Sequence, residues 1–275
     1  MWSEEIPYDV AGEQPPEERR AAWDVAFGLQ AVDGLTPSSY MRTLADDHVA
    51  GRRTYDEIDR TLRTYYREIS GDPQARPAEA DIVSLRIAEL LADDSFTLSV
   101  ATVKTIHRFL FAGVFTDVPA GEFRSVNITK KEPILGGDTV SYSSYFMIAD
   151  TLDYDFGKEK SFDYRPLDTT GKARHLMEFI SGIWQIHPFR EGNTRTTAVF
   201  AIKYARTLGF AIDNVPFRDH SQYFRDALVA DNYHKNRHPE FLRLFTDAVF
   251  LGGTAPLDVA AMAATMSETL PHSQG

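Results

Sequence analysis

The sequence predicts a mainly α-helical protein with a single β-hairpin. Apolar residues recur at three-to-four spacing along most of the chain, as Leu176, Ile180 and Ile183 do, and that period is typical of helices with one buried face. Prolines, glycines and capping residues separate these runs where helices should begin and end. The strand signal lies in Val126 to Tyr142, where a Gly-Gly-Asp turn separates two β-prone segments.

Start and stop signals define most of the expected helices. Gly34 is placed to end the first in a left-handed cap, Thr36-Pro37 suits the cap and first residue of the second, and Thr54 with Glu57 forms a capping box for the third. Residues 153–168 are expected to be a polar loop. Helices are expected over residues 16–32, 37–49, 54–69, 78–91, 98–111, 143–152 and 169–186, from 193 or 194 onward, and over 219–231 and 239–251.

Composition limits the classes of function. The 275 residues include 29 basic and 40 acidic side chains, a net charge of −11, which argues against a nucleic-acid polymer as partner because that partner needs a basic face. Without cysteine there is no disulfide framework and no thiolate zinc site. No apolar run approaches the roughly 20 residues that span a bilayer, and residues 1–14 do not read as a signal peptide. A cytoplasmic protein without membrane contact is expected, and homo-oligomerisation stays open.

The stretch from Ile186 to Thr196 concentrates the chemically active residue types. We expect a tight loop between two buried helices, because a residue before proline is disfavoured in a helix and Asn193 or Thr194 can cap the next helix. A helix N-terminus offers unpaired N–H groups and a partial positive charge to an anion. Gly192 lets the backbone approach a phosphate closely. The loop therefore predicts an anion site.

Three side chains of this loop suit phosphoryl or nucleotidyl transfer. Arg195 can reach the same anion with two hydrogen bonds. Glu191 would repel a bare phosphate but suits a phosphate that carries Mg²⁺. His187 can accept a proton near neutral pH. Taken singly, each has a plainer explanation, since acids are favoured at helix N-termini, histidines at helix C-termini, and arginines at the surface.

Together these residues resemble the signature of the Fic family, H-x-F-x-[D/E]-G-N-G-R-x-x-R. The matching residues are His187, Phe189, Glu191, Gly192, Asn193 and Arg195. Members of this family usually transfer AMP from ATP to a hydroxyl side chain of a target protein, on a helical bundle with a hairpin flap over the motif loop. The resemblance extends from about Phe96 to about Gly252 and implies a catalytic domain at residues 77–253. The linker at 71–77 separates it from an N-terminal helical unit at 1–76, which has a loose arm at 1–15 and by the resemblance a regulatory role, and residues 254–275 are expected to be a tail or a short surface helix.

The resemblance also implies a role for each matching residue. His187 would act as general base on a Ser, Thr or Tyr hydroxyl of the target, which then attacks the α-phosphorus of ATP. Glu191 would hold Mg²⁺ on the phosphates, Asn193 would steady the α-phosphate, and Arg195 would bind the β-phosphate. The other residues expected at the nucleotide are Gly192, Thr194, Tyr223, Arg225 and Asn232, the last three equally explained as helix surface and packing.

Two positions depart from the signature. Thr194 stands where the family has glycine, and Ala198 stands where it has a second arginine that takes the γ-phosphate. Loss of one charged phosphate contact typically costs a few kcal/mol, so we expect a transferase that is weak or uses another donor. Two alternatives stay open: a Fic-type transferase for another nucleotide or a phosphate, and a non-catalytic module that binds a nucleotide or peptide.

Two further segments have expected roles by the same resemblance. The flap, about residues 128–142, would hold the target protein by strand addition, with Lys130 and Lys131 as surface charges. Leu29 to Gly34 is a poor match to the inhibitory helix of the family, with Asp33 in place of its glutamate. Because the family's partner arginine is Ala198 here, Asp33 is not expected to form that ion pair, and Asp33→Gly is expected to change activity little.

Overall fold

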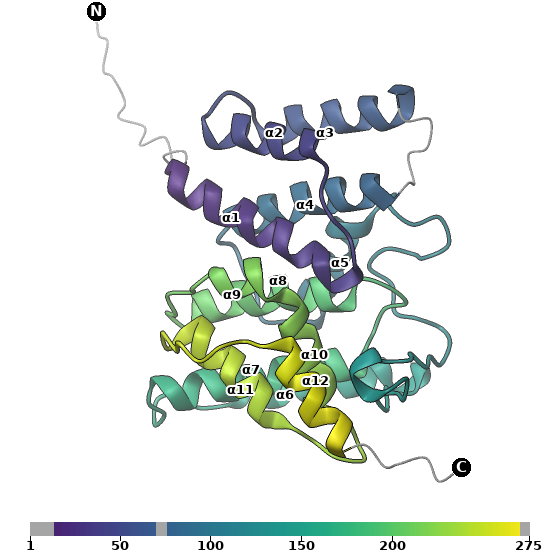
Figure 1. Ribbon diagram of the computed structural model, residues 1–275, viewed down its shortest axis with the longest axis vertical. Coiled ribbons are helices and arrows are strands. Elements are labelled where there is room, and N and C mark those ends of the chain that lie inside the picture. The colour runs from purple at the N-terminus through teal and green to yellow at the C-terminus, as the bar shows by residue number, and fades with distance from the viewer. Residues whose placement is uncertain (1–13, 70–75, 270–275) are drawn as a thin grey trace, which may run out of the picture.

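The computed structural model of the protein describes residues 14–69 and 76–269, which fold into helices joined by loops. The α-helices are α1 Pro16–Gly28, α2 Ser39–Val49, α3 Tyr55–Thr64, α4 Arg76–Ala92, α5 Val100–Phe111, α6 Ile148–Ser161, α7 Thr169–Ile186, α8 Asn193–Thr207, α9 Val215–Asp219, α10 Ser221–Asp231, α11 Pro239–Phe250 and α12 Val259–Thr269. Figure 1 shows α2 and α3 at one end of the long axis, α6, α7, α11 and α12 at the other, and α1, α4, α5 and α8 between them. The predicted helical class is confirmed.

Local signals explain how the N-terminal helices begin and end. A 3-10 turn, η1 (Leu29–Asp33), follows α1 directly and ends at Gly34, whose φ of 65° is the expected left-handed cap. The capping box of Thr54 and Glu57 is present at the start of α3. One π-helical turn, η2 (Tyr65–Ile69), extends that helix.

Two expected boundaries differ from the structure. The cap of α2 is Ser38 rather than Thr36, because the Ser38 hydroxyl accepts the backbone N–H of Met41 in the first turn of the helix. The segment 153–168 is not all loop, since α6 continues to Ser161. Phe156 and Glu159 are buried along the inner face of α6, so packing extends a helix whose surface residues are polar.

The segment 128–142, called here the flap loop, contains no strand among its described residues. Instead it is irregular and carries one 3-10 turn, η3 (Pro133–Leu135), which corrects the β-hairpin of the predicted fold. A backbone hydrogen bond of 2.9 Å, from the N–H of Glu132 to the carbonyl of Asp138, closes this turn. The proline has no N–H to donate to a ladder, so it interrupts strand pairing at the first residue after that bond.

The N-terminal helices share one hydrophobic core with the remainder of the described chain. Helix α1 packs on α4 and α9, while η1 packs on α8 and α10. Trp23 on α1 is fully buried in this core. The consequence for function is that polar side chains of η1 are carried to the first turn of α8.

The C-terminal segment contributes to the core as well. Helix α12 packs on α10 and on η3, and its Met262 and Met266 are fully buried. Within the segment 254–275, which was expected to be a tail or a short surface helix, residues 259–269 therefore form a packed helix. None of the helices in the described ranges combines the length and the apolar character needed to cross a membrane.

We predict that Asp81→Ala destabilises the N-terminal helices. The fully buried carboxylate of Asp81 accepts hydrogen bonds from the backbone N–H and hydroxyl of Ser38, at 2.7 and 2.5 Å, and from the hydroxyl of Tyr66 at 2.6 Å. Removing the acceptor leaves these donors without a partner, so the free energy of unfolding should fall by about 3 kcal/mol. Chemical denaturation measures this, with the exposed Asp56→Ala as control. A loss below about 1 kcal/mol would contradict the prediction.

Candidate functional site

The loop between α7 and α8, residues 187–192, is called here the motif loop, and it begins with a histidine in an unusual backbone conformation. Helix α7 ends at Ile186, and His187 follows with φ 52° and ψ 60°, a left-handed conformation found at no other non-glycine residue of the described ranges. Such a conformation costs about 1–3 kcal/mol and persists where its surroundings impose it. Here Arg124 imposes it, because its Nε donates to the His187 carbonyl at 2.8 Å and its backbone N–H donates to the Pro188 carbonyl at 2.8 Å.

The hydrogen bonds of the His187 ring define its tautomer. Nδ1 lies 3.2 Å from the carbonyl oxygen of Trp184. Because a carbonyl only accepts, Nδ1 carries the proton and Nε2 presents a lone pair. Nε2 is buried and has no hydrogen-bond partner among the described residues. The ring contacts the ring of Tyr142 at a centroid distance of 4.5 Å.

Burial keeps this histidine neutral. Desolvation holds the pKa of His187 well below its usual 6.5, and the charge of Lys130 acts in the same direction. The hydrogen bond to Trp184 opposes these effects, while Arg124 and Arg225 add smaller lowering contributions. A neutral imidazole with a free Nε2 lone pair is the form that accepts a proton at physiological pH.

Helix α8 starts next to this lone pair with its N-terminus uncapped. Gly192 is the N-cap, at φ 73°, and no side chain caps the helix. A Cβ at this position would lie 2.3 Å from the ring of Phe111, so both conformation and space require glycine. The N–H groups of the first turn have no acceptor within the helix and are available to an anion.

Asn193 and Thr194 support the loop rather than cap α8. The side-chain amide of Asn193 bonds both backbone groups of Phe189, accepting from its N–H at 2.9 Å and donating to its carbonyl at 2.8 Å. The hydroxyl of Thr194 accepts from the indole N–H of Trp184 at 3.0 Å, joining α8 to α7. The expected capping roles of these two residues are therefore not observed.

A cavity of about 240 Å³ connects the histidine with the uncapped helix end. This volume is below the 300–1,000 Å³ that is usual for small-molecule sites. A nucleotide thus needs more room than the cavity offers. Its lining residues are Val32, Asp33, Lys130, Glu132, Trp184, His187, Gly192, Asn193, Thr194 and Arg225.

Arg195 does not line this cavity, and its buried guanidinium lies among Gln30, Asp33 and Glu79. Its Nη1 donates to the side-chain oxygen of Gln30 at 3.1 Å, and its Nη2 donates to Glu79 at 2.7 Å. Its Nε lies 2.8 Å from a carboxylate oxygen of Asp33, an ionic contact without the alignment of a hydrogen bond. The guanidinium also lies 4.8 Å from the ring centroid of Phe111. Every nitrogen of the guanidinium therefore has an acidic or amide partner.

Comparisons with known proteins agree with this architecture. Residues 97–205 match the model of the Fic/DOC family. The chain contains a Fic/DOC-family domain. No curated protein matches it.

The Fic/DOC domain also resembles solved structures. The N-terminal Fic domain of a putative cell filamentation protein, a VirB-translocated Bep effector from Bartonella quintana with bound ADP, is 22% identical, with a TM-score of 0.51 over 70% of this chain and 86% of that one. A second structure of that domain has 22% identity and a TM-score of 0.47 over 70% and 84% of the two chains. BepC from Bartonella tribocorum, with bound AMPPNP, has 19% identity and a TM-score of 0.42 over 55% and 74%. At these identities the likeness is one of fold.

The cluster around Arg195 changes the interpretation of Asp33 in this Fic/DOC domain. We expected that Asp33 would not form the family's ion pair, because Ala198 replaces the second arginine of the motif. Ala198 is indeed fully buried on α8, but Asp33 pairs with the first arginine instead. Glu79, which the sequence analysis did not single out, supplies a second carboxylate from α4. The premise for expecting a silent Asp33→Gly substitution is therefore removed.

Glu191 is exposed, and its carboxylate has no partner among the described residues. Nowhere in these residues does a group of three or more His, Asp or Glu side chains form a ready metal site. Mg²⁺ typically binds through one or two carboxylates together with substrate phosphates and water. Glu191 alone fits such a metal only when a nucleotide brings it.

Of the three residues on or next to α10 that were expected at the nucleotide, the structure places only one at the cavity. Arg225 lines the cavity, but Tyr223 and Asn232 do not. Tyr223 is buried with its ring parallel to that of Phe245, and the amide of Asn232 donates to the hydroxyl of Ser181 at 2.8 Å. Both contacts belong to the packing of α10.

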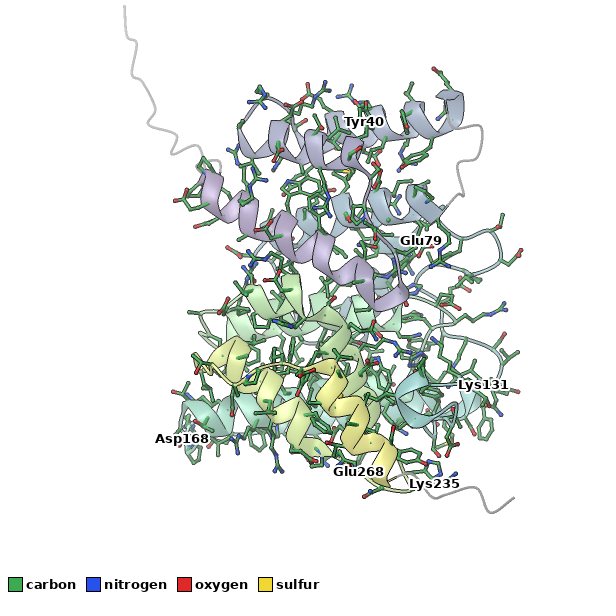
Figure 2. The ribbon with its side chains drawn as sticks, viewed as in Figure 1. Tyr40, Glu79, Lys131, Asp168, Lys235 and Glu268 are labelled. Carbon is green, nitrogen blue, oxygen red and sulfur yellow. The ribbon has the colours of Figure 1, made fainter. Side chains whose placement is uncertain are left out.

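Side chains of the flap loop tie it to α10 and to the chain that follows. Glu132 is fully buried and forms an ion pair with Arg225. The hydroxyl of Tyr142 donates to the same carboxylate at 2.9 Å. Further along, Asp138 accepts from the Tyr233 hydroxyl at 2.9 Å and from Lys235 at 2.6 Å, and Figure 2 shows Lys235 at the lower edge of the molecule. The loop therefore has a defined position over the motif without strand pairing.

Sequence reasoning missed one more supporting residue, His107 on α5. Its Nδ1 accepts the N–H of Gly121 at 2.8 Å, so its Nε2 must donate to the backbone carbonyl of Glu191, 3.0 Å away. The ring stacks on Phe189 at a centroid distance of 3.8 Å. Its distance of eighty-four positions from Glu191 in the chain means that no local motif points to it.

We predict that His107 makes the domain less stable at acidic pH. Burial lowers the pKa of His107 from 6.5 to about 4, so below 6.5 the unfolded chain binds a proton that the folded protein resists. The stabilisation is complete above pH 6.5 and is lost as the pH falls towards 4. Between about pH 7.5 and about pH 5 this histidine should remove about 2 kcal/mol from the free energy of unfolding.

Denaturation of the wild type and of His107→Gln at the two pH values measures this contribution. The pH-dependent loss of stability should be smaller in His107→Gln by about 2 kcal/mol. The exposed His234→Gln serves as the control and should keep the wild-type dependence. Equal pH dependences in all three proteins would show that His107 is not the group responsible.

Proposed function

We propose that this Fic/DOC domain transfers AMP from ATP to a hydroxyl side chain of a target protein. The main support for this proposal is the buried Nε2 lone pair of His187. It has no partner in the described residues and faces a cavity shared with the uncapped end of α8. Nε2 of His187 can accept a proton, and the N–H groups at the start of α8 can bind a phosphate. The Bartonella quintana domain of the same fold carries ADP, which makes an adenine nucleotide the first donor to test.

The proposed reaction balances as a nucleotidyl transfer. Nε2 of His187 removes the proton from the target hydroxyl, whose oxygen forms a bond to the α-phosphorus. The bond between the α-phosphorus and the bridging oxygen breaks, and pyrophosphate leaves with the electron pair. The N–H groups at the start of α8 stabilise the charge on the α-phosphate oxygens. Glu191 would hold Mg²⁺ on the phosphates, where the metal neutralises charge.

An exposed apolar surface beside the flap loop supports a protein as the acceptor. Phe146 is 66% exposed, and Val126, Tyr145 and Met147 are also exposed. The Asn127 side chain accepts the backbone N–H of Tyr145 at 3.0 Å, which places the two parts of this surface together. Exposed apolar patches of this kind commonly bind other proteins.

We predict that labelling with α-³²P-ATP and Mg²⁺ depends on His187. Wild-type protein, His187→Ala and the exposed control His234→Ala are incubated alone and with a host lysate. Label should appear on the protein itself or on a lysate protein with the wild type and with His234→Ala, and should fall at least about 100-fold with His187→Ala. The same proteins are incubated with the other α-³²P-labelled nucleotides, and label from one of these alone would identify a different donor.

A nucleotide-binding measurement on the wild type and on Glu191→Ala tests the alternative of a non-catalytic binding module. Nucleotide binding that needs Glu191, without transfer that depends on His187, would favour a binding module. That result would contradict the proposed enzyme. Label on the protein that persists in His187→Ala would contradict the assigned base.

We further propose that the N-terminal helices hold this protein in an inhibited state. Arg195 is the motif residue expected at the β-phosphate, yet Gln30, Asp33 and Glu79 occupy its nitrogens. The guanidinium is fully buried, so a phosphate can reach it only after η1 or α4 releases it. Position 198 has alanine instead of the second motif arginine, and Arg195 is already paired with other side chains. Both features support weak basal turnover.

We predict that the double substitution Asp33→Asn and Glu79→Gln raises activity. Both changes keep the side-chain shape and remove the charges that hold Arg195, which lowers the free energy of unfolding. The arginine becomes available, so nucleotide affinity and labelling per folded molecule should rise about tenfold. The control is Glu17→Gln on the exposed start of α1. A double variant that folds as the wild type and shows neither increase would contradict the inhibited state.

A further inference from the structure

The positively charged side chains near the cavity differ in whether carboxylates already neutralise them. Arg195 is surrounded by two carboxylates and an amide. Arg225 pairs with Glu132, and its Nη1 lies 2.8 Å from Asp226. A guanidinium between two carboxylates has little charge left for a ligand.

Lys130 is the exception among the lining residues that the structure describes. It lies on the flap loop, is half-buried and lines the cavity. No hydrogen bond or ion pair of its ammonium group with another described residue is found at this position. Its charge is close enough to His187 to lower that residue's pKa, second only to burial. The cavity therefore has one unmatched ammonium group facing the histidine and the start of α8.

We propose that Lys130 binds a phosphate of the nucleotide in this cavity. Its ammonium group would replace the cationic contact of the second motif arginine, which is Ala198 in this chain. This inference rests on the proposed function. The ligand class is a nucleoside polyphosphate, because a cavity with one ammonium group, a row of unpaired N–H groups and a buried histidine acceptor matches an anionic ligand. It revises our expectation that Lys130 is only a surface charge.

The fixed position of the flap loop makes this contact possible. Glu132, two residues after Lys130, is held by Arg225 and Tyr142. These contacts keep the backbone beside Lys130 above the cavity, so the lysine reaches a phosphate without folding of the loop. Its neighbour Lys131 is exposed and does not line the cavity, and Figure 2 places it at the outer edge of the molecule. A matched control thus stands at the next position in the chain.

The test compares ADP and ATP affinity, with Mg²⁺, for the wild type, Lys130→Met, Lys131→Met and Lys130→Arg. Isothermal titration calorimetry is run at about 50 and about 200 mM salt. Lys130→Met should weaken both nucleotides at least about tenfold and should reduce the salt dependence of binding. Lys131→Met should stay within about twofold, and Lys130→Arg should keep most of the affinity because it retains the charge.

The outcomes distinguish this inference from the proposed function. Equal losses in Lys130→Met and Lys131→Met would indicate a general field effect and would overturn the specific contact. Unchanged affinity in Lys130→Met, with labelling by the wild type intact, would overturn the inference and leave the proposed function standing. No binding of either nucleotide to the wild type or to the double variant Asp33→Asn and Glu79→Gln would overturn both.

Discussion

The buried guanidinium of Arg195 is the interaction on which the arrangement of this protein depends. It joins η1, α4 and α8 through Gln30, Asp33 and Glu79. A buried charge that lost these partners would be strongly destabilising. The same contacts therefore fix how the N-terminal helices sit on the Fic/DOC domain and keep the arginine from any ligand. Structural cohesion and restraint of the site have one physical cause.

Around this cluster, the motif loop is held by contacts that come from distant parts of the chain. Arg124 bonds the carbonyl groups at the end of α7, and His107 bonds the carbonyl of Glu191. Asn193 closes the loop on Phe189 from within. These bonds satisfy backbone groups that a tight buried loop would otherwise leave unpaired. They also impose the left-handed conformation that directs the His187 ring to the cavity.

The electrostatics of the cavity follow from this packing. Burial keeps His187 neutral, and the carboxylates of Glu132 and Asp226 largely neutralise Arg225. The positive character that remains comes from helix α8 and from Lys130. Such a cavity offers an anion few cationic contacts, which accords with Ala198 standing where the motif has its second arginine.

Much of this protein is determined by local sequence. The capping box at Thr54, the left-handed stop at Gly34 and the two helices around the motif could be predicted, because caps and apolar periods act over one or two helical turns. The motif residues from His187 to Arg195 could be recognised for the same reason. Their spacing along the chain is itself the signal.

Tertiary structure decided the remainder. The partner of Asp33 could not be predicted, since Arg195 lies more than a hundred residues away and the choice depends on how η1 packs on α8. His107 is likewise brought to the motif by helix packing. The sequence of the flap loop predicts a β-hairpin, but in the structure this loop has no strand, and Glu132 forms a buried ion pair with Arg225. Buried charges pair with whatever the packed core places beside them, and that placement is a property of the whole fold.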